Sequence, residues 1–212
     1  AGALAVTGMQ FASAGYRLKG AAITLSSSSG AKPIIRVGDG SGTHYTATID
    51  SVLTGSSGLE KTDVGTLILT GANSYSGGTT VSGGVLQGNS ISLQGDIINN
   101  AKVRFDQATA GSYVGAMGGS GVLEKTGAGT LILSGANSYS GGTTIVAGTL
   151  VGHSSSFGSG AINIKQQGTL EIAQDSDSTL ANDLSGSGIL SKTGAGALRL
   201  TGDGSGFTGS ID

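Results

Sequence analysis

The two histidines could serve a metal site or a nucleophilic triad, so their placement bears first on chemistry. His44 and His153 lie in non-equivalent places, and the chain has no cysteine. A zinc site needs three or four clustered ligands, and no His-x-x-x-His or cysteine pair exists. Ser41, His44 and Asp50 can be drawn as a triad, but serine is so abundant that chance explains this set better. We interpret both histidines as surface turn residues.

A group of carboxylates in the last quarter of the chain could form an acid–base pair or bind calcium weakly. Glu171, Asp175, Asp177 and Asp183 make up the richest local group. A glycosidase needs two facing carboxyl groups, and β-helical lyases and glycosidases place such acids along one exposed face. A solvated loop is the simpler interpretation of these four residues.

Two GDGSG segments resemble calcium loops only faintly. They occupy Gly38–Gly42 and Gly202–Gly206. The recurring G-G-x-G-x-D nonapeptide of calcium-binding β-rolls is absent, so tight turns are the favoured interpretation. The sequence therefore predicts no catalytic, cofactor-binding or metal-ligating residue, and we expect a protein that is not an enzyme.

Lysines and tyrosines recur at equivalent places in the chain. Lys61, Lys125 and Lys192 each stand in the same local sequence. We interpret them as a solvated edge that discourages off-register strand pairing, with a binding stripe as the alternative. Tyr75 and Tyr139 are expected to pack at a corner of the fold rather than to stack on a ligand.

The composition limits the kinds of partner. Of 212 residues, 41 are glycine and one is proline, while 37% are hydrophobic and 11% are charged. Soluble domains usually carry about 25% charged residues, so Ser, Thr, Asn and Gly must cover this surface. A net charge of −2 without any basic run makes nucleic acid and anionic membranes poor partners.

The ends and the apolar runs indicate how the chain relates to a membrane. No run reaches about 18 apolar residues, so no transmembrane helix and no direct membrane insertion are predicted. The first residues lack the basic and long apolar segments of a signal peptide. We therefore expect the chain to be a piece cut from a larger precursor.

Internal repetition is the most informative feature. Leu59–Val81 and Leu123–Ile145 match without a gap at an offset of 64, and Leu190–Gly202 matches at a further offset of 67. Shorter strand-like segments repeat as well, in two sets: Ile23–Leu25, Ile91–Leu93 and Ile162–Ile164; and Ile35–Val37, Val103–Phe105 and Leu170–Ile172. We expect a single domain over residues 1–212, with repeats at about 21–88, 89–153 and 154–212, the last truncated.

The repeat pattern predicts an all-β fold. Glycine every few residues disfavours helices, whereas Leu131, Leu133, Asn137, Tyr139 and Thr143 share one parity, which is typical of short strands. Tandem strands of this kind can stack on one another and bury a continuous core. The predicted architecture is a right-handed parallel β-helix with two or three coils of about 20 residues in each repeat.

Such a solenoid would form a rod of roughly ten coils, on the order of 50 Å long. Ile, Leu and Val are expected to stack inside. Asn73 and Asn137 are expected at turns, where asparagine adopts left-handed backbone or pairs with neighbouring amides.

The repeated segments resemble a known family. GTLILTGANSYSGGTTVSGGVLQGN, from Gly65, and GTLILSGANSYSGGTTIVAGTLVGH, from Gly129, closely resemble the autotransporter-associated β-strand repeat, also called the passenger-associated transport repeat. Its motif is G-x-G-T-L-x-L-x-G-x-N-x-Y-x-G-x-T-x-V-x-x-G-x-L. The third copy departs, because GDGSGFTGSID replaces GANSYSGGTTI and Phe207 stands near the place of the tyrosine.

The resemblance implies a function that the residues alone do not. It implies a β-helical passenger, carried through the outer membrane by a C-terminal β-barrel in type V secretion. Such passengers often act as adhesins, aggregation factors or virulence proteins at the cell surface or after release. The repeat itself is thought to promote folding and secretion.

We therefore expect a non-catalytic extracellular module that binds a host cell surface, extracellular matrix or a receptor protein, with self-association as a further possibility. One alternative is a secreted effector that binds one specific host receptor. A carbohydrate-active β-helix enzyme with Glu171 or Asp175 at its centre is a weaker one. A scaffold whose active portion lies elsewhere in the precursor is the last.

Overall fold

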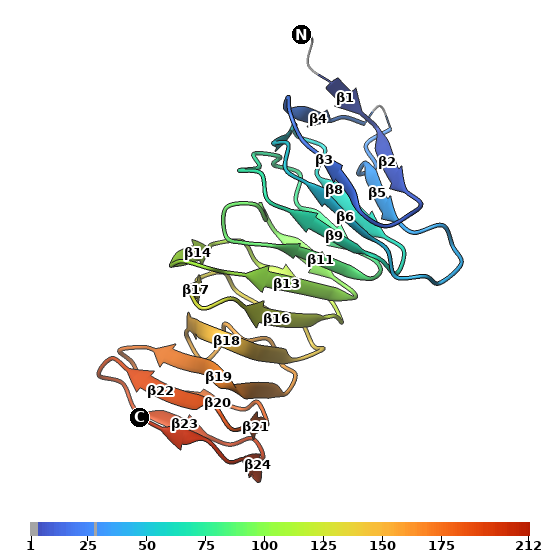
Figure 1. Ribbon diagram of the computed structural model, residues 1–212. Helices are drawn as coiled ribbons and strands as arrows, with labels where there is room; N and C mark the ends of the chain where they lie inside the picture. Colours follow the sequence, from blue (N-terminus) through green and yellow to red (C-terminus); the bar gives the residue numbers. More distant parts are fainter. Residues whose placement is uncertain (1–3, 28) are drawn as a thin grey trace. The chain divides into compact units, whose positions relative to one another are not determined.

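The computed structural model describes residues 4–27 and 29–212, and in this part of the chain every regular element is a β-strand. Two compact units divide the chain, Ala1–Arg104 and Phe105–Asp212. The strands within each unit pair in parallel, as they must in a solenoid. The predicted all-β fold is confirmed, and Figure 1 shows the strands stacked edge to edge in each unit.

Among its described residues the first unit contains thirteen strands, the last of which crosses the division between the units. They are β1 Leu4–Val6, β2 Gly8–Phe11, β3 Tyr16–Leu18, β4 Ile23–Leu25, β5 Ile34–Val37, β6 Thr46–Ile49, β7 Leu53–Thr54, β8 Leu59–Thr62, β9 Thr66–Leu69, β10 Thr79–Val81, β11 Val85–Gly88, β12 Ile97–Asn99 and β13 Lys102–Asp106.

Three columns of strands run through this unit, and each of the first three coils contributes one strand to each column. Their orders are β1-β4-β7, then β2-β5-β8-β10-β12, then β3-β6-β9-β11. Leu59 pairs with Thr79 and Thr66 pairs with Val85, so these coils have the predicted length. An earlier coil is longer, with Tyr16 paired to Ala47, and the loop from Gly38 to Tyr45 supplies part of the extra length. Another part precedes Ile34, which pairs with Gly8.

The second unit contains the remaining strands. They are β14 Gly111–Tyr113, β15 Met117–Gly118, β16 Val122–Thr126, β17 Thr130–Leu133, β18 Thr143–Gly152, β19 Ile162–Ala173, β20 Ser178–Leu180, β21 Leu184–Gly186, β22 Ile189–Thr193, β23 Leu198–Leu200, β24 Gly206–Phe207 and β25 Ser210–Ile211. The long strands β18 and β19 each turn a corner, and a register shift marks that corner between Ile145 and Ala147.

The same three-column arrangement recurs in the second unit. One column runs through β16, the first halves of β18 and β19, β21 and β24. A second runs through β14, β17, the later halves of β18 and β19, β22 and β25. The third contains the pair β20-β23. Both units are therefore parallel β-solenoids, while the predicted right-handed coiling stays a prediction.

Matched strands of successive repeats do not stack on one another, contrary to the simplest form of the prediction. Strand β22 is the repeat equivalent of β16, yet it lies in the column of β17. The equivalent of β17 is β23, which pairs with β20 in the third column. In the strand register, Leu190 lies three coils beyond Leu131. In the self-comparison of the sequence, however, Leu190 is the equivalent of Leu123. The repeat is therefore longer than three coils. Its additional residues place each matched strand in a different strand column of the solenoid.

The core consists of inward side chains stacked coil upon coil. In the second unit Leu131, Leu150, Leu170 and Leu190 stand in register in four successive coils, and each is at most 2% exposed. The expected stacking of Ile, Leu and Val inside the solenoid is confirmed. Burial of these columns supplies the main stabilising free energy, because the chain has no disulfide and few charges.

One of the predicted strands is misplaced. Ile91 lies in a turn and is 61% exposed, so Ile91–Leu93 is not a strand. The strand that corresponds to Ile162–Ile164 is β12, because it pairs with β10 as β19 pairs with β18. The second set of segments is correct, since all three of its members form strands. The three repeat boundaries and the single domain stay predictions.

Candidate functional site

The recurring lysines are the largest departure from the sequence-based interpretation. Lys61 and Lys125 are completely buried and do not form a solvated edge. Lys61 Nζ donates to the main-chain oxygens of Thr62, Asp63 and Gly83 at 2.8, 2.8 and 3.0 Å. The interpretation as an exposed edge is wrong because Lys61 has the same strand parity as the inward-facing Leu59.

Lys125 repeats this arrangement in the second unit. Its Nζ donates to the oxygens of Thr126, Gly127 and Ala147 at 2.8, 2.7 and 3.1 Å. Burial lowers the pKa of Lys125 to about 8, and Asp106 opposes the shift. Burial likewise lowers the pKa of Lys61 to about 8 against the opposing charge of Asp63. Both ammonium groups therefore remain protonated at neutral pH.

Lys192 binds its own turn in the same way but completes its set differently. It donates to the oxygens of Thr193 and Gly194 at 2.6 and 3.0 Å, and to Gln174 of the preceding coil at 3.2 Å. Lys125 and Lys192 lie in different strand columns, on β16 and β22. These lysines therefore do not form a stripe along one face, which removes the binding-stripe alternative for this pair.

A left-handed residue shapes the turn that holds each lysine. After Lys125 and Lys192 this residue is a glycine, Gly127 with φ 76° and Gly194 with φ 82°. After Lys61 it is Asp63, with φ 65°. At Gly127 a Cβ would lie 2.6 Å from the oxygen of Gln107, so only glycine fits there. Asp63 fits because its carboxylate accepts bonds from Arg36 Nε and the Gly40 amide in the inserted loop.

Asparagine side chains link three successive coils. Asn73 Oδ1 accepts from the Leu53 amide at 2.8 Å, and its Nδ2 donates to Ser92 O at 2.7 Å. Asn137 makes the same two bonds, with the Met117 amide and Ser156 O. The expected pairing with neighbouring amides is confirmed. The alternative prediction, a left-handed backbone at the two asparagines, is wrong. Among the described residues, Asp63 is the one non-glycine residue with positive φ.

The tyrosines pack at corners, as predicted. Tyr75 and Tyr139 are 2% and 0% exposed, and their hydroxyls bond to Thr79 Oγ1 and Thr143 Oγ1 at 2.9 and 2.7 Å. Burial raises the pKa of both phenols. Neither ring is available for stacking on a ligand.

The carboxylates singled out in the sequence act as links between coils. Asp175, Asp177 and Asp183 each accept a main-chain N–H one coil on, from Ala195, Ala197 and Asp203 respectively. Glu171 Oε1 accepts from Thr193 Oγ1 at 2.9 Å. These bonds give all four residues a structural role. No group of three or more metal-ligating side chains occurs among the described residues.

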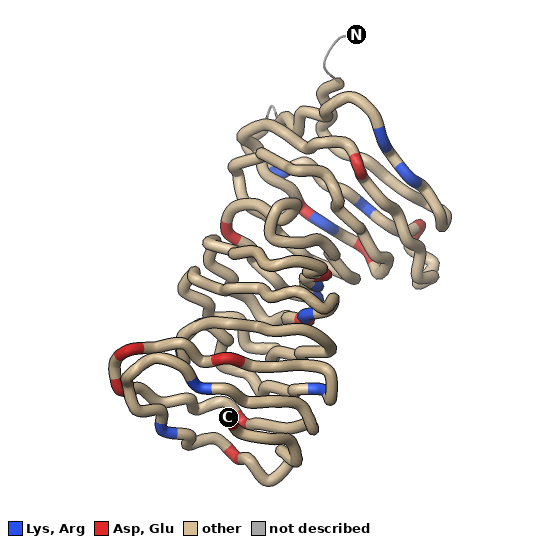
Figure 2. Tube along the Cα trace, turned by 60° about the vertical axis from the view of Figure 1, so that its left-hand side comes forward, with Lys and Arg blue, Asp and Glu red and all other residues tan. Residues whose placement is uncertain are grey.

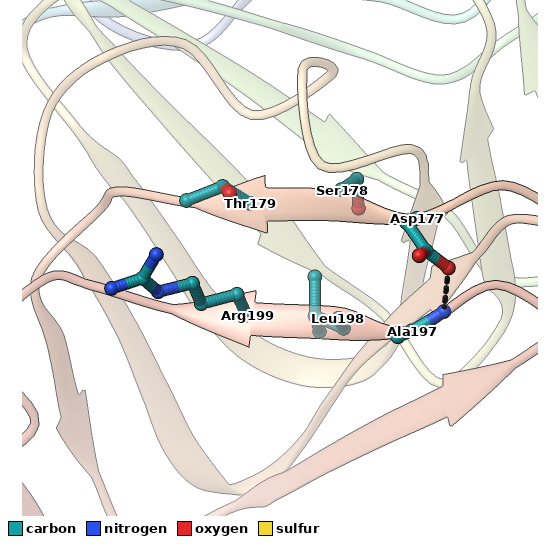
Figure 3. Close-up of a pocket in the computed structure, with 6 residues that line it drawn as sticks. All are labelled: Asp177, Ser178, Thr179, Ala197, Leu198 and Arg199. Carbon is teal, nitrogen blue, oxygen red and sulfur yellow. Dashed lines mark hydrogen bonds between the residues drawn. The ribbon is translucent and has the colours of Figure 1, made fainter.

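A shallow hollow of about 350 Å³ lies against strands β20 and β23, lined by Asp177, Ser178, Thr179, Ala197, Leu198 and Arg199 (Figure 3). Its lining contains one carboxylate, which accepts the Ala197 amide at 2.8 Å. Ser178 Oγ is buried and has no hydrogen-bond partner. A glycosidase would need a second facing carboxyl group, and this lining does not supply one.

The drawn Ser-His-Asp set does not form a triad. Asp50 binds Arg17 and Thr70, while Ser41 Oγ donates to Thr43 Oγ1 at 3.0 Å. His44 and His153 are both exposed, as expected of turn residues.

The GDGSG segments form tight turns, as predicted. Asp39 Oδ1 accepts from the Ser41 amide, and Asp203 Oδ1 accepts from the Ser205 amide. The bonds from Ser41 lower the pKa of Asp39 to about 2, with a smaller contribution from Tyr45. Each carboxylate therefore stabilises its own turn.

Charged residues are sparsely distributed along the Cα trace in Figure 2. Two ion pairs join Arg17 to Asp50 and Arg36 to Asp63 in the first unit. No helix among the described residues is long and apolar enough to cross a membrane.

Comparison with known proteins agrees with this geometry. Residues 59–87, 123–151 and 190–212 match the family described as the passenger-associated-transport repeat. The chain is also 41% identical over 198 residues to the Adhesin BmaC autotransporter of Brucella suis biovar 1 (strain 1330), an alignment that covers 80% of this chain. The chain spans 6% of that relative's length. No solved structure matches the chain.

The fold and its buried polar residues define the chain as a parallel β-solenoid of tandem repeats. The three family matches identify those repeats as passenger-associated-transport repeats, so the chain belongs among the autotransporter passengers that carry them. The resemblance seen in the sequence is confirmed.

Proposed function

We propose that this chain is a non-catalytic module of an adhesin-type autotransporter passenger, displayed outside the cell. In this role, the stacked coils form a stiff scaffold, and the outer surface of the scaffold makes the adhesive contacts. Relatedness to an autotransporter adhesin over most of the chain supports this assignment.

One structural observation carries the proposal. The recurring residues Lys61, Asn73 and Tyr75 face the interior or fasten neighbouring coils, whereas the recurring Ser74 and Ser76 are exposed. The recurring inward residues therefore stabilise the stack of coils, which supports a structural role for the repeat. Because β22 and β23 lie in other strand columns than their repeat equivalents β16 and β17, adhesive groups at matched positions of the second unit would lie on different faces of that unit.

The outer surface supports contact through shape and polar groups. Outward positions are mostly uncharged, such as the in-register Thr130, Thr149 and Thr169 on β17, β18 and β19. Exposed apolar side chains occur among them, with Val114 at 78% and Ile132 at 39%. A host cell surface, extracellular matrix or another copy of the chain are the partners that we propose.

Binding of the purified, labelled chain to host cells and to matrix-coated surfaces tests the proposal, with size-exclusion chromatography for self-association. We expect binding or self-association from the folded chain and a loss of either when it is heat-unfolded. A matched pair, Val114→Ser with Ile132→Ser against Lys165→Ser, separates an apolar contact from a general effect of surface substitution. A folded chain that binds neither cells, matrix nor itself would contradict the adhesive role.

A specific effector is the second candidate function. It predicts saturable binding to one purified host receptor that unlabelled chain competes away. Binding that rises without saturation on many surfaces would instead favour general adhesion.

The hollow beside β23 gives a direct test of the enzymatic alternative. Asp177→Asn leaves the coil-to-coil acceptor in place but removes the one carboxylate in this lining. We expect no polysaccharide turnover by the original chain. Turnover that Asp177→Asn, Glu171→Gln or Asp175→Asn abolishes would overturn the non-catalytic assignment.

A further inference from the structure

We propose that the recurring lysine forms an internal cation site, in which its ammonium group fastens a turn to the next coil in the way that a bound metal ion would. The site consists of three main-chain carbonyl oxygens. Two belong to the turn that follows the lysine, and the third belongs to the next coil, at Gly83 for Lys61 and at Ala147 for Lys125.

The geometry of the site suits a primary ammonium ion. A lysine ammonium group has three N–H donors and no acceptor, and here each donor meets one carbonyl oxygen within 3.1 Å. The same three-oxygen set forms in both units, around residues that are 0% exposed. The ammonium group gives each of the three carbonyl oxygens at the corner a hydrogen-bond donor, and Thr126 O accepts from the Gln107 amide as well.

The lysine stem occupies an inward position that apolar residues occupy in the neighbouring coils. In the strand register Lys61 lies between Ile35 and Val81, and Lys125 pairs with Ile145. The apolar residues at these inward positions show that burial alone does not require a charge there. A buried charge is costly unless it is fully hydrogen-bonded, so the three hydrogen bonds of the ammonium group have to carry the advantage.

In the first two repeats, the lysine therefore supplies a cation that joins its own turn to the next coil. The hydrogen bonds at this corner can form once the next coil has folded onto the turn. No metal ion from the solvent is needed. The consequence is that alignment of the two coils at the corner depends on a group that donates three hydrogen bonds at this position.

The experiment uses the full chain and four variants, Lys125→Met, Lys125→Ala, Lys61→Met and the exposed control Lys165→Met. We expect Lys125→Met and Lys61→Met each to lower the unfolding midpoint by roughly 5–10 °C. Hydrogen exchange should accelerate around residues 147–148 or 83–84 respectively. Lys165→Met should leave the midpoint and exchange unchanged.

Chemical rescue separates a cation site from loss of packing. Propylammonium matches the part of the side chain that Lys125→Ala removes, so we expect it to restore the midpoint, whereas 1-propanol or sodium chloride should not. If Lys125→Ala does not fold, the yield of refolded protein with propylammonium replaces the midpoint as the readout. Equal rescue by 1-propanol, no rescue by propylammonium, or a Lys125→Met chain as stable as the original would each overturn the proposal.

Discussion

At the residue scale, strand parity was the signal that located the inward positions. Leu59 and Lys61 are two residues apart, so burial of the leucine places the lysine inside as well. A general preference for exposed lysine obscured that signal. The three carbonyl partners could not be predicted, because the third comes from another coil.

The buried lysines give the chain a pH dependence with a defined sign. Their folded pKa is about 8 and their unfolded value is 10.5, so between these values the unfolded chain binds more protons than the folded one. Desolvation of the ammonium groups sets this sign, while their bonds to the carbonyl oxygens hold the corners at neutral pH. The free energy of unfolding should therefore rise as the pH increases from 8 toward 10. Denaturant titrations at pH 7.5, 8.5 and 9.5 measure this slope.

The matched variant for this prediction is the double substitution Lys61→Met with Lys125→Met. It should flatten the slope over that range, while the buried phenols stay protonated because burial raises their pKa. A slope of the same size in the double variant would show that other groups cause it.

Asparagine provides a second test at this scale. Asn73→Ala leaves the Leu53 amide and the Ser92 oxygen without their partner inside the solenoid. We expect a loss of about 2–4 kcal/mol in the free energy of unfolding, because each unpaired buried group costs about 1–3 kcal/mol. Ser74→Ala, at the exposed neighbouring position, is the control. Equal stability of both variants would contradict the bridging role.

At the scale of elements, period-two patterning predicted most strands correctly and failed where a turn imitates a strand. Ile91 and Leu93 share a parity, but Asn89 folds the chain back, because its side chain and main-chain oxygens accept from Ile91, Ser92 and Leu93. The true strand, β12, begins only at Ile97. Local alternation could not separate the two, since only pairing with β10 distinguishes them.

The stacked leucines make a quantitative prediction for these elements. Leu150 lies between Leu131 and Leu170 in register and is 0% exposed. Leu150→Ala should lower the free energy of unfolding by about 2–5 kcal/mol through lost burial and a residual cavity. The outward neighbour Val151→Ala should cost less than about 1 kcal/mol. Denaturant unfolding compares them, and a similar loss in both would place Leu150 outside the core.

At the scale of the whole molecule, the repeat length and the coil length are different quantities. Self-comparison aligns Leu123 with Leu190, whereas strand pairing places Leu190 one coil beyond Leu170. The sequence predicted the coil length, yet not the shift from face to face. The shift of matched strands between columns depends on the number of residues in each coil. A comparison of the repeat sequences with one another does not give that number.

Engineered disulfides test this architecture most directly, because the chain has no cysteine of its own. Ile132 pairs with Val151 on the adjacent strand, whereas the repeat equivalent of Ile132 is Arg199, on β23 in another column. Neighbouring parallel strands lie about 4.8 Å apart, within the Cα distance that a disulfide spans. Oxidation of an Ile132→Cys, Val151→Cys chain should therefore form the bond readily, while an Ile132→Cys, Arg199→Cys chain should stay reduced as a monomer. Efficient closure of the second pair and not the first would contradict a solenoid whose coils are shorter than its repeats.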